Sequence, residues 1–469
     1  MAHNGVRIDK DVEMREVRES PNYQSTRRTI MSVRSRIGIG LGMCAMVSLL
    51  GGTTVFAQAP ETSKEAESLF KSMGFKIYGA VDASYTHNFN NPSTNINQMR
   101  IFDTQANSFS PNVAQIVFEK TAVASGSAMD RVGFRARTSF GPNSRFSRAR
   151  TNYQPGQDSS ELDIQELYAE YIAPIGNGLK IQAGKIHTLI GFEQINSWDN
   201  PNFSRTNMFG LSQAFTTTGI RFTYTWNPML TTTIGLINGW DNIEDNNRGK
   251  SFEYLVALTP HERFGVSVYG SYGAEQSNGN AVFGNAATGV CTNYTPGCDP
   301  SAKRTVVGAI ITAKVTNSDT IILEPYYGNE GNARAAGSQN ARWNGIGAYH
   351  IHDFNDQWSS RIRGTIWEDA GGVRSCVGGN NFNGGTNSCA GGPGGFTAGG
   401  PGGGFNTQTG GGVAQTVWDV TLTLQYKPAP SLLTRVEYRH DHSNRNVFLY
   451  GTQPVNNQNT LAFQVVYMF

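Results

Sequence analysis

Apolar and polar side chains alternate along most of this chain, from residue 75 to the last residue. In the final segment, Leu461, Phe463, Val465, Tyr467 and Phe469 share one parity, so an extended strand places all five on the same face. The same two-residue period predicts about sixteen strands, most of them near the length that a tilted membrane strand requires. The predicted strands cover residues 75–87, 112–120, 130–140, 162–172, 179–187, 216–226, 230–240, 250–258, 263–273, 303–314, 319–328, 341–352, 357–367, 415–427, 431–442 and 459–469.

The connections between these strands alternate between short and long. The short ones are rich in Pro, Asn, Asp and Gly, as tight turns are, and include 173–178, 227–229, 259–262, 315–318, 353–356 and 428–430. The long ones are 88–111, 141–160, 188–215, 241–249, 274–302, 329–340, 368–414 and 443–458. This alternation is typical of outer-membrane barrels, whereas a Greek-key sandwich has no reason to show it. We therefore predict an all-β, transmembrane, antiparallel up-and-down β-barrel with short periplasmic turns and long external loops.

Composition agrees with a barrel that faces lipid. Hydrophobic residues make up 38% of the chain, a modest share, because only alternate residues of a membrane strand need to be apolar. The net charge of +2 gives no bias toward nucleic acid. Aromatic residues near the predicted strand ends indicate an interfacial girdle. They are Trp226, Trp240, Tyr327, Trp343, Trp358, Trp418, Tyr426, Tyr438, Tyr467 and Phe469.

The first 57 residues differ from the alternating region. Arg34 and Arg36 precede an apolar stretch over 37–50, and the small-residue pattern before Gln58 completes a secretory signal peptide. The apolar stretch is shorter than the roughly 20 residues that a membrane-spanning helix needs. Translation from Met31 is an alternative start. The expected organisation is an N-terminal extension and signal peptide over 1–57 (the signal over about 31–57), a short periplasmic segment over 58–74 and an outer-membrane β-barrel over 75–469.

Four of the five cysteines follow the signal peptide and form two near pairs. Cys291 lies near Cys298, and Cys376 near Cys389, each pair within one polar, Gly-rich long loop. Local disulfides are expected in an oxidising compartment. A zinc site is the alternative, although the spacings are not those of paired CxxC knuckles. We predict disulfides and no metal.

Five runs carry a family resemblance: YGAVDASYTHNFNNP (78–92), RIFD (100–103), AGKIHTLIGFE (183–193), DNPNFSR (199–205) and NGWDNIEDNN (238–247). Through them the chain resembles the OmpL-like β-barrel porin family over nearly all of residues 75–469. The resemblance implies an outer-membrane porin of a Gram-negative bacterium, with no catalytic residues and no cofactor. Its partners would be outer-membrane lipid and small hydrophilic solutes, and a homotrimer is expected by analogy with other porins.

A barrel of about sixteen strands is wide enough for a water-filled channel, which allows passive diffusion of solutes and ions. Inward parity places several arginines on the lumen side: Arg131, Arg135, Arg137, Arg221, Arg361, Arg363, Arg435 and Arg439. Inward carboxylates include Asp82, Glu119, Glu166, Glu170, Glu253, Glu324, Glu437 and Asp441. The denser arginine cluster favours anions. Equally, Glu119, Glu166 and Glu170 could neutralise the arginines of 130–140 across adjacent strands.

The third long loop, 188–215, is the candidate constriction. It mixes aromatic and charged residues, among them Phe192, Glu193, Trp198, Asp199 and Arg205. The third external loop folds into the pore in sixteen-stranded general porins, which is an analogy. The alternative is an external lid that packs over its neighbours.

Two other functions remain open at this point. A plugged structural or adhesive barrel is suggested by the long Gly-rich loop around 391–405. A barrel-rim hydrolase would need a nucleophile or activated water beside an oriented His, and the cluster available is His440, Asp441 and His442. No serine motif accompanies that cluster, so we predict that the protein is not an enzyme.

Overall fold

The structure is a computed structural model that describes residues 73–149, 161–276, 301–333, 340–372, 374–375, 405–406, 411–412 and 414–469. The predicted signal peptide, nearly all of the predicted segment 58–74 and all five cysteines lie outside these ranges, so both disulfides remain predictions. Residues Phe75–Phe469 form one compact unit.

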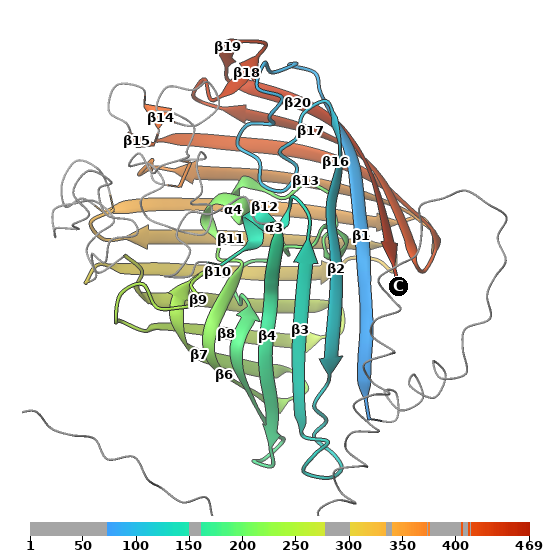
Figure 1. The fold of residues 1–469 in the computed structure, drawn as a ribbon, viewed down its shortest axis with the longest axis vertical. Helices are drawn as coiled ribbons and strands as arrows, with labels where there is room; N and C mark the ends of the chain where they lie inside the picture. Colours follow the sequence, from blue (N-terminus) through green and yellow to red (C-terminus); the bar gives the residue numbers. More distant parts are fainter. Residues whose placement is uncertain are drawn as a thin grey trace, which may run out of the picture. The chain divides into compact units, whose positions relative to one another are not determined.

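Sixteen strands of the described residues close into an antiparallel barrel in which each strand pairs with its neighbour in chain order (Figure 1). They are β1 (Phe75–Asn88), β2 (Ser108–Lys120), β3 (Val132–Phe140), β4 (Leu162–Ala173), β5 (Leu179–His187), β6 (Thr216–Asn227), β7 (Leu230–Trp240), β8 (Ser251–His261), β9 (Phe264–Ala274), β10 (Lys303–Lys314), β11 (Asp319–Glu330), β12 (Ala341–Asp353), β13 (Trp358–Asp369), β16 (Gln415–Ala429), β17 (Leu432–Ser443) and β20 (Asn457–Met468). The predicted fold class is confirmed, and most predicted bounds agree to within a few residues.

The last strand closes the barrel against the first. β1 pairs with β20 from Ala80 opposite Met468 to Asn88 opposite Thr460. Beyond β20, the backbone of Phe469 exchanges two hydrogen bonds with Gly79, at 2.9 and 3.0 Å. Closure matters because an unpaired strand edge cannot satisfy its backbone groups in lipid.

The two faces of β20 show why its sequence alternates. Phe463, Val465 and Tyr467 are exposed on the outer surface, where lipid would cover them. The residues between them, Gln464 and Val466, are buried on the inner side. Because the inner surface of a sixteen-stranded barrel does not contact lipid, it accepts polar and charged side chains that the outer surface excludes.

Short turns gather at one end of the barrel and long connections at the other. We call these the short-turn end and the long-loop end. The long connections also carry the remaining elements: α3 (Ser144–Ser147), η1 (Ser197–Asp199), α4 (Asn207–Ser212), β14 (Phe405–Asn406), β15 (Gly411–Gly412), β18 (Phe448–Tyr450) and β19 (Gln453–Val455). Within the described ranges, no helix has the length and apolar character needed to cross a membrane.

The predicted aromatic girdle is right in part. Trp226, Trp358 and Trp418 lie exposed on the outer face. Trp240 and Trp343 are buried inside the barrel instead, so their placement in the girdle is wrong. Both contact the guanidinium of Arg374, at 4.8 and 5.0 Å from the ring centroids. Strand-end position alone does not tell which face a tryptophan takes, because a buried cation gives an inward ring a favourable partner.

Candidate functional site

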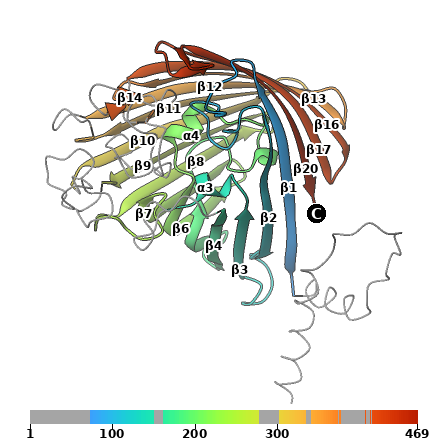
Figure 2. The same cartoon turned by 45° about the horizontal axis from the view of Figure 1, so that its top comes forward.

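Loop 3 (residues 188–215) leaves β5 at the long-loop end, runs inside the barrel and returns to β6. Almost all of its residues from Glu193 onward are buried, and it contains η1 and α4. Helix α4 contacts β12 and β13 and lies within the ring of strands (Figure 2). Thr206 caps this helix by accepting a hydrogen bond of 3.0 Å from the Phe209 N–H.

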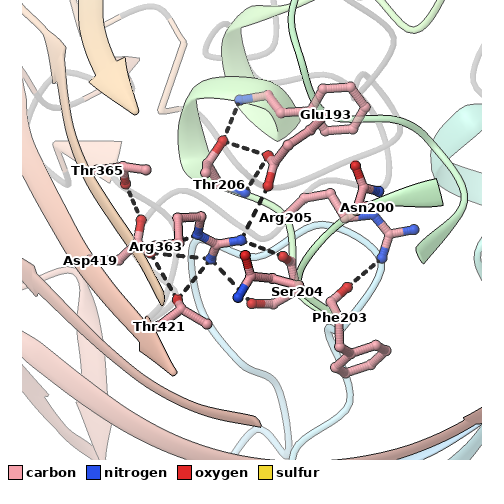
Figure 3. A network of polar contacts seen from close by, with 12 residues as sticks. Glu193, Asn200, Phe203, Ser204, Arg205, Thr206, Arg363, Thr365, Asp419 and Thr421 are labelled. Carbon is pink, nitrogen blue, oxygen red and sulfur yellow. Dashed lines mark hydrogen bonds and ion pairs between the residues drawn. The ribbon is translucent and has the colours of Figure 1, made fainter. Parts of the chain in front are cut away.

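Arg363, on β13, holds the middle of loop 3 (Figure 3). Its guanidinium lies 3.1 Å from Glu193 of the loop and 3.1 Å from Asp419 of β16. It also donates to the Thr421 hydroxyl at 2.9 Å and to the Ser204 backbone carbonyl. All three charged side chains are fully buried. One barrel-wall arginine therefore joins the loop to the wall through charge-assisted hydrogen bonds, which are the stronger kind.

Glu193 completes this contact from the loop side. Its carboxylate accepts hydrogen bonds from the Thr206 N–H at 2.8 Å and the Thr206 hydroxyl at 2.7 Å. Burial raises the pKa of the Glu193 carboxyl, and the nearby Arg363 charge opposes that shift. The same carboxylate thus binds a wall cation and the cap of α4.

β17 supplies a second anchor for the loop backbone. The Glu437 carboxylate accepts from the Phe203 N–H at 2.6 Å and from the Ser204 N–H at 2.9 Å. Two residues earlier on the strand, Arg435 donates to the carbonyls of Ser197 at 2.8 Å and Asn200 at 2.6 Å. These side chains satisfy backbone groups of an irregular segment that would otherwise be buried without partners.

Loop 1 (residues 89–107) also enters the barrel. Arg100 forms ion pairs with Asp103 of the same loop and with Asp441 of β17, all of them buried. Beside it, Phe102 packs against Phe146 and Phe215, with ring centroids 5.9 and 5.6 Å away. These rings belong to a hydrophobic cluster inside the long-loop half that joins loop 1, loop 3 and inward aromatic residues of several strands. The sequence interpretation missed this role for loop 1, although the RIFD run mixes apolar and charged residues in the required way.

The predicted constriction residues take different roles. Glu193 and Arg205 are buried, and Arg205 donates to the Phe203 carbonyl at 2.8 Å and lies 4.7 Å from the centre of the Phe102 ring. Phe192 packs edge-on against Tyr349 at 4.9 Å. Trp198 packs on a small cluster near the short-turn end, formed by Ala80, Leu433 and Val466. Asp199 is exposed. Loop 3 therefore reaches from the long-loop end nearly to the opposite end.

The arginines predicted on the 130–140 strand are largely neutralised. Arg135 lies 2.6 Å from Glu119, and Arg137 lies 3.0 Å from Glu166. Arg131 falls one residue before β3 and donates to the Ile172 carbonyl at 3.3 Å. The alternative of cross-strand neutralisation therefore holds for two of the three arginines.

The other predicted lumen residues lie on inward strand positions and are mostly engaged. Arg221 pairs with Glu253 at 2.9 Å. Arg439 pairs with Asp441 at 2.8 Å and donates to the Arg205 carbonyl. Asp82 accepts from the Ser197 hydroxyl at 2.6 Å, and Arg361 pairs with Asp353 at 3.0 Å. Asp82 and Arg439 thus hold loop 3, whereas Arg221 and Arg361 pair with carboxylates of the barrel wall.

The lumen stays accessible to water on one side. Near the short-turn end, inward residues of β6 to β10 are partly exposed, namely Thr223, Thr231, Leu255, Ser267 and Thr312. The corresponding residues of β16, β17 and β20 are buried, because loop 3 lies over them: Gln425, Arg435 and Gln464. Loop 3 therefore covers the side of β16, β17 and β20 and leaves inward residues of β6 to β10 partly exposed.

Strand geometry places Asp441 on the opposite face from His440 and His442, the residues that a rim hydrolase would use. Asp441 faces inward and binds Arg100 and Arg439. His440 and His442 face outward against Trp418, with ring centroids 5.1 and 5.3 Å away. Neighbouring strand residues point to opposite faces, so the carboxylate cannot orient either imidazole. Among the described residues, no group of three or more His, Cys, Asp or Glu could hold a metal ion.

Solved structures of outer-membrane channels share this architecture. The channel DcaP of Acinetobacter baumannii has a TM-score of 0.50 at 10% identity, over 84% of this chain and 97% of that chain. An anion-selective porin from Comamonas acidovorans has a TM-score of 0.50 at 8% identity, over 84% and 99%. Pseudomonas putida OprB has a TM-score of 0.50 at 11% identity, over 87% and 97%. At these identities the similarity establishes the fold.

No curated protein matches the sequence. The profile of the family described as "Putative beta-barrel porin-2, OmpL-like" matches residues 74–469, which include every barrel strand. This family match places the chain in the outer membrane of a Gram-negative bacterium. The chain belongs to the OmpL-like β-barrel porin family.

Proposed function

We propose that this protein is a porin through which small hydrophilic solutes and ions diffuse passively, with loop 3 as its constriction. Family membership and the sixteen-stranded barrel support this function, because a barrel of that size can enclose an aqueous channel. The observation that carries the proposal is the position of loop 3. It lies inside the barrel, fixed to one side by Arg363, Arg435 and Glu437, while the side near β6 to β10 keeps partly exposed inward residues.

Single-channel conductance in a planar bilayer tests the proposal. The barrel chain is refolded in detergent, and its folded state is checked by heat-modifiable mobility on a gel before insertion. We expect stable, uniform conductance steps. A correctly folded barrel that produces no steps would overturn the diffusion function.

A plugged, structural barrel is the second candidate, and one observation favours it. The long-loop half contains the hydrophobic cluster that includes Met99, Phe102, Phe209 and Phe215, all buried inside the barrel. Such a cluster excludes water. A barrel that is silent in bilayers but conducts once loop 3 is released would support this candidate over the open porin.

We propose no enzymatic role, because the outward His440 and His442 lack the oriented carboxylate that a rim hydrolase would need. We also propose a homotrimer, by analogy with other porins. Native mass spectrometry of the detergent-extracted protein tests the assembly, and a monomer as the sole species would contradict it.

A further inference from the structure

Three cations stand on the accessible side of the lumen, on β3 and β5. Arg135, Arg137 and Lys180 form what we call the cationic wall. Each has a carboxylate on a neighbouring strand: Arg135 with Glu119 at 2.6 Å, Arg137 with Glu166 at 3.0 Å and Lys180 with Glu170 at 3.1 Å. The three cations and their three carboxylate partners together carry no net charge.

Exposure to water is unequal within each pair. The Arg135 side chain is 27% exposed and that of Glu119 10%. Lys180 is 40% exposed and Glu170 6%. Arg137 is 14% exposed and Glu166 4%. In all three pairs the cation lies toward the lumen and the carboxylate lies behind it, so a passing solute meets positive charge first.

Hydrogen bonds explain why the carboxylates stay behind the cations. Glu170 accepts from the Ala122 N–H at 2.9 Å and from the Gln182 amide at 3.3 Å. These contacts fix its oxygens against the wall. Arg135 has a tyrosine hydroxyl, that of Tyr78, at 3.5 Å, and its longer side chain remains more exposed than that of Glu119. The asymmetry therefore follows from side-chain length and from which partner is tied to the backbone.

Beyond β5, the inward charges of β6 and β8, Arg221 and Glu253, are buried. Lys180 is paired in register with Thr223 of β6, where an uncharged surface begins. We call it the neutral wall; its partly or fully exposed inward residues are Thr223, Thr225, Thr231, Leu255, Ala257, Ser267, Ile310 and Thr312. Two exposed carboxylates lie outside the strands of this side: Asp130 in the β2–β3 turn, and Asp199 of loop 3, which accepts from the Asn196 amide at 3.0 Å. Asp353 is exposed at the end of β12. A solute beside β3 to β6 thus meets exposed cations next to hydroxyl groups.

We infer that the cationic wall, backed by the neutral wall, is an anion-contacting surface and that the preferred solutes are small anions, including carboxylates. The inference rests on the proposed diffusion function. Its physical basis is that the field near a wall of paired charges is dominated by the nearer, less screened member of each pair. Carboxylates have the geometry to accept from guanidinium and ammonium donors at the same time.

The test separates exposed charge from net charge. The double variants Arg135→Gln/Glu119→Gln and Lys180→Gln/Glu170→Gln, and the quadruple combination, each remove equal numbers of both charges. They also avoid leaving a buried carboxylate unpaired, which would disturb folding. Lys303→Gln, an exposed cation outside the lumen, is the matched control. Reversal potentials are measured in KCl and in potassium acetate gradients.

In both salts we expect the parent to give a reversal potential with the sign of an anion-preferring channel. The reversal potential should shift progressively toward zero in the double and quadruple variants. The Lys303→Gln control should retain the parent value. A conducting parent with zero or cation-directed potential, or quadruple-variant potentials equal to those of the parent, would overturn the inference and leave the porin function standing. A folded barrel without conductance would overturn the porin function and the inference together.

Discussion

Arg363 provides the strongest prediction, because it joins loop 3 to the wall through four partners. Replacing it in the variant Arg363→Gln removes the cation between two buried carboxylates, those of Glu193 and Asp419. Breaking a buried ion pair in this way costs about 3–5 kcal/mol. The lower end applies here, since Asp419 keeps Arg439 at 3.6 Å and Glu193 keeps its bonds to Thr206.

A cost of about 3 kcal/mol corresponds to more than a hundredfold shift in an equilibrium. The barrel strands do not depend on loop 3 for their backbone pairing, so the shift should act on the docked loop rather than on the barrel. We expect Arg363→Gln to conduct better than the parent, with larger or noisier single-channel steps. Protease cleavage within 188–215 should become faster, while heat-modifiable mobility still reports a folded barrel.

Arg361→Gln is the matched control, since it lies two residues earlier on the same inward face. Its partner Asp353 is 55% exposed, and such pairs contribute about 1 kcal/mol or less. Conductance and protease resistance should stay at parent levels. If Arg363→Gln behaves like Arg361→Gln in both assays, the idea that this arginine fixes the loop is wrong.

Three further predictions concern the same loop and the barrel seam. In Glu437→Gln, the new amide group turns a donor toward one of the two backbone N–H groups that Glu437 accepts from. The docking of loop 3 should weaken by about 1–3 kcal/mol, measured as faster protease cleavage within 188–215. An unchanged cleavage rate would contradict this role. Because burial raises the pKa of Glu193, the docked loop binds a proton more tightly than the free loop. Docking of loop 3 is therefore favoured below pH 4.5, the ordinary pKa, and weakens as the pH rises through the raised pKa of docked Glu193. The conductance of the parent should increase with pH between these two pKa values, and that of Glu193→Gln should depend less on pH. Deleting Phe469 removes the two backbone hydrogen bonds to Gly79 and should lower the yield of heat-modifiable folded barrel, whereas Phe469→Leu, which keeps them, should fold closer to the parent level.

The barrel could be predicted from the sequence alone because the positions of its strands and turns are encoded by neighbouring residues. A two-residue period places each side chain on one face of its own strand, and turn residues mark where strands end. Nearly every predicted strand agrees with the structure to within a few residues. β2 is the clearest exception, beginning at Ser108 rather than at residue 112. A register irregularity opposite Asp82 and Ser84 breaks the alternation there and hides the start of the strand.

The fate of the inward charges was beyond the sequence. Parity correctly put Arg363, Arg435 and Arg439 on the inner face, yet all three hold loop 3 or loop 1 contacts and are buried. Their partners lie far away in the chain, such as Glu193 for Arg363. Only the folded barrel brings these segments together, so parity can predict the face of a residue but not what covers it.

Exposure within ion pairs was likewise decided by tertiary structure. The sequence predicted both that Arg135 and Arg137 would line the lumen and that glutamates could neutralise them, and it could not choose. In the barrel both statements hold in part, because the glutamates pair with the arginines from behind and leave the cations nearer the water. The alternating pattern alone determined the barrel and its two faces, since a strand imposes that period on its own residues. Loop position and side-chain reach, which depend on contacts across the closed barrel, decided which charges meet a solute.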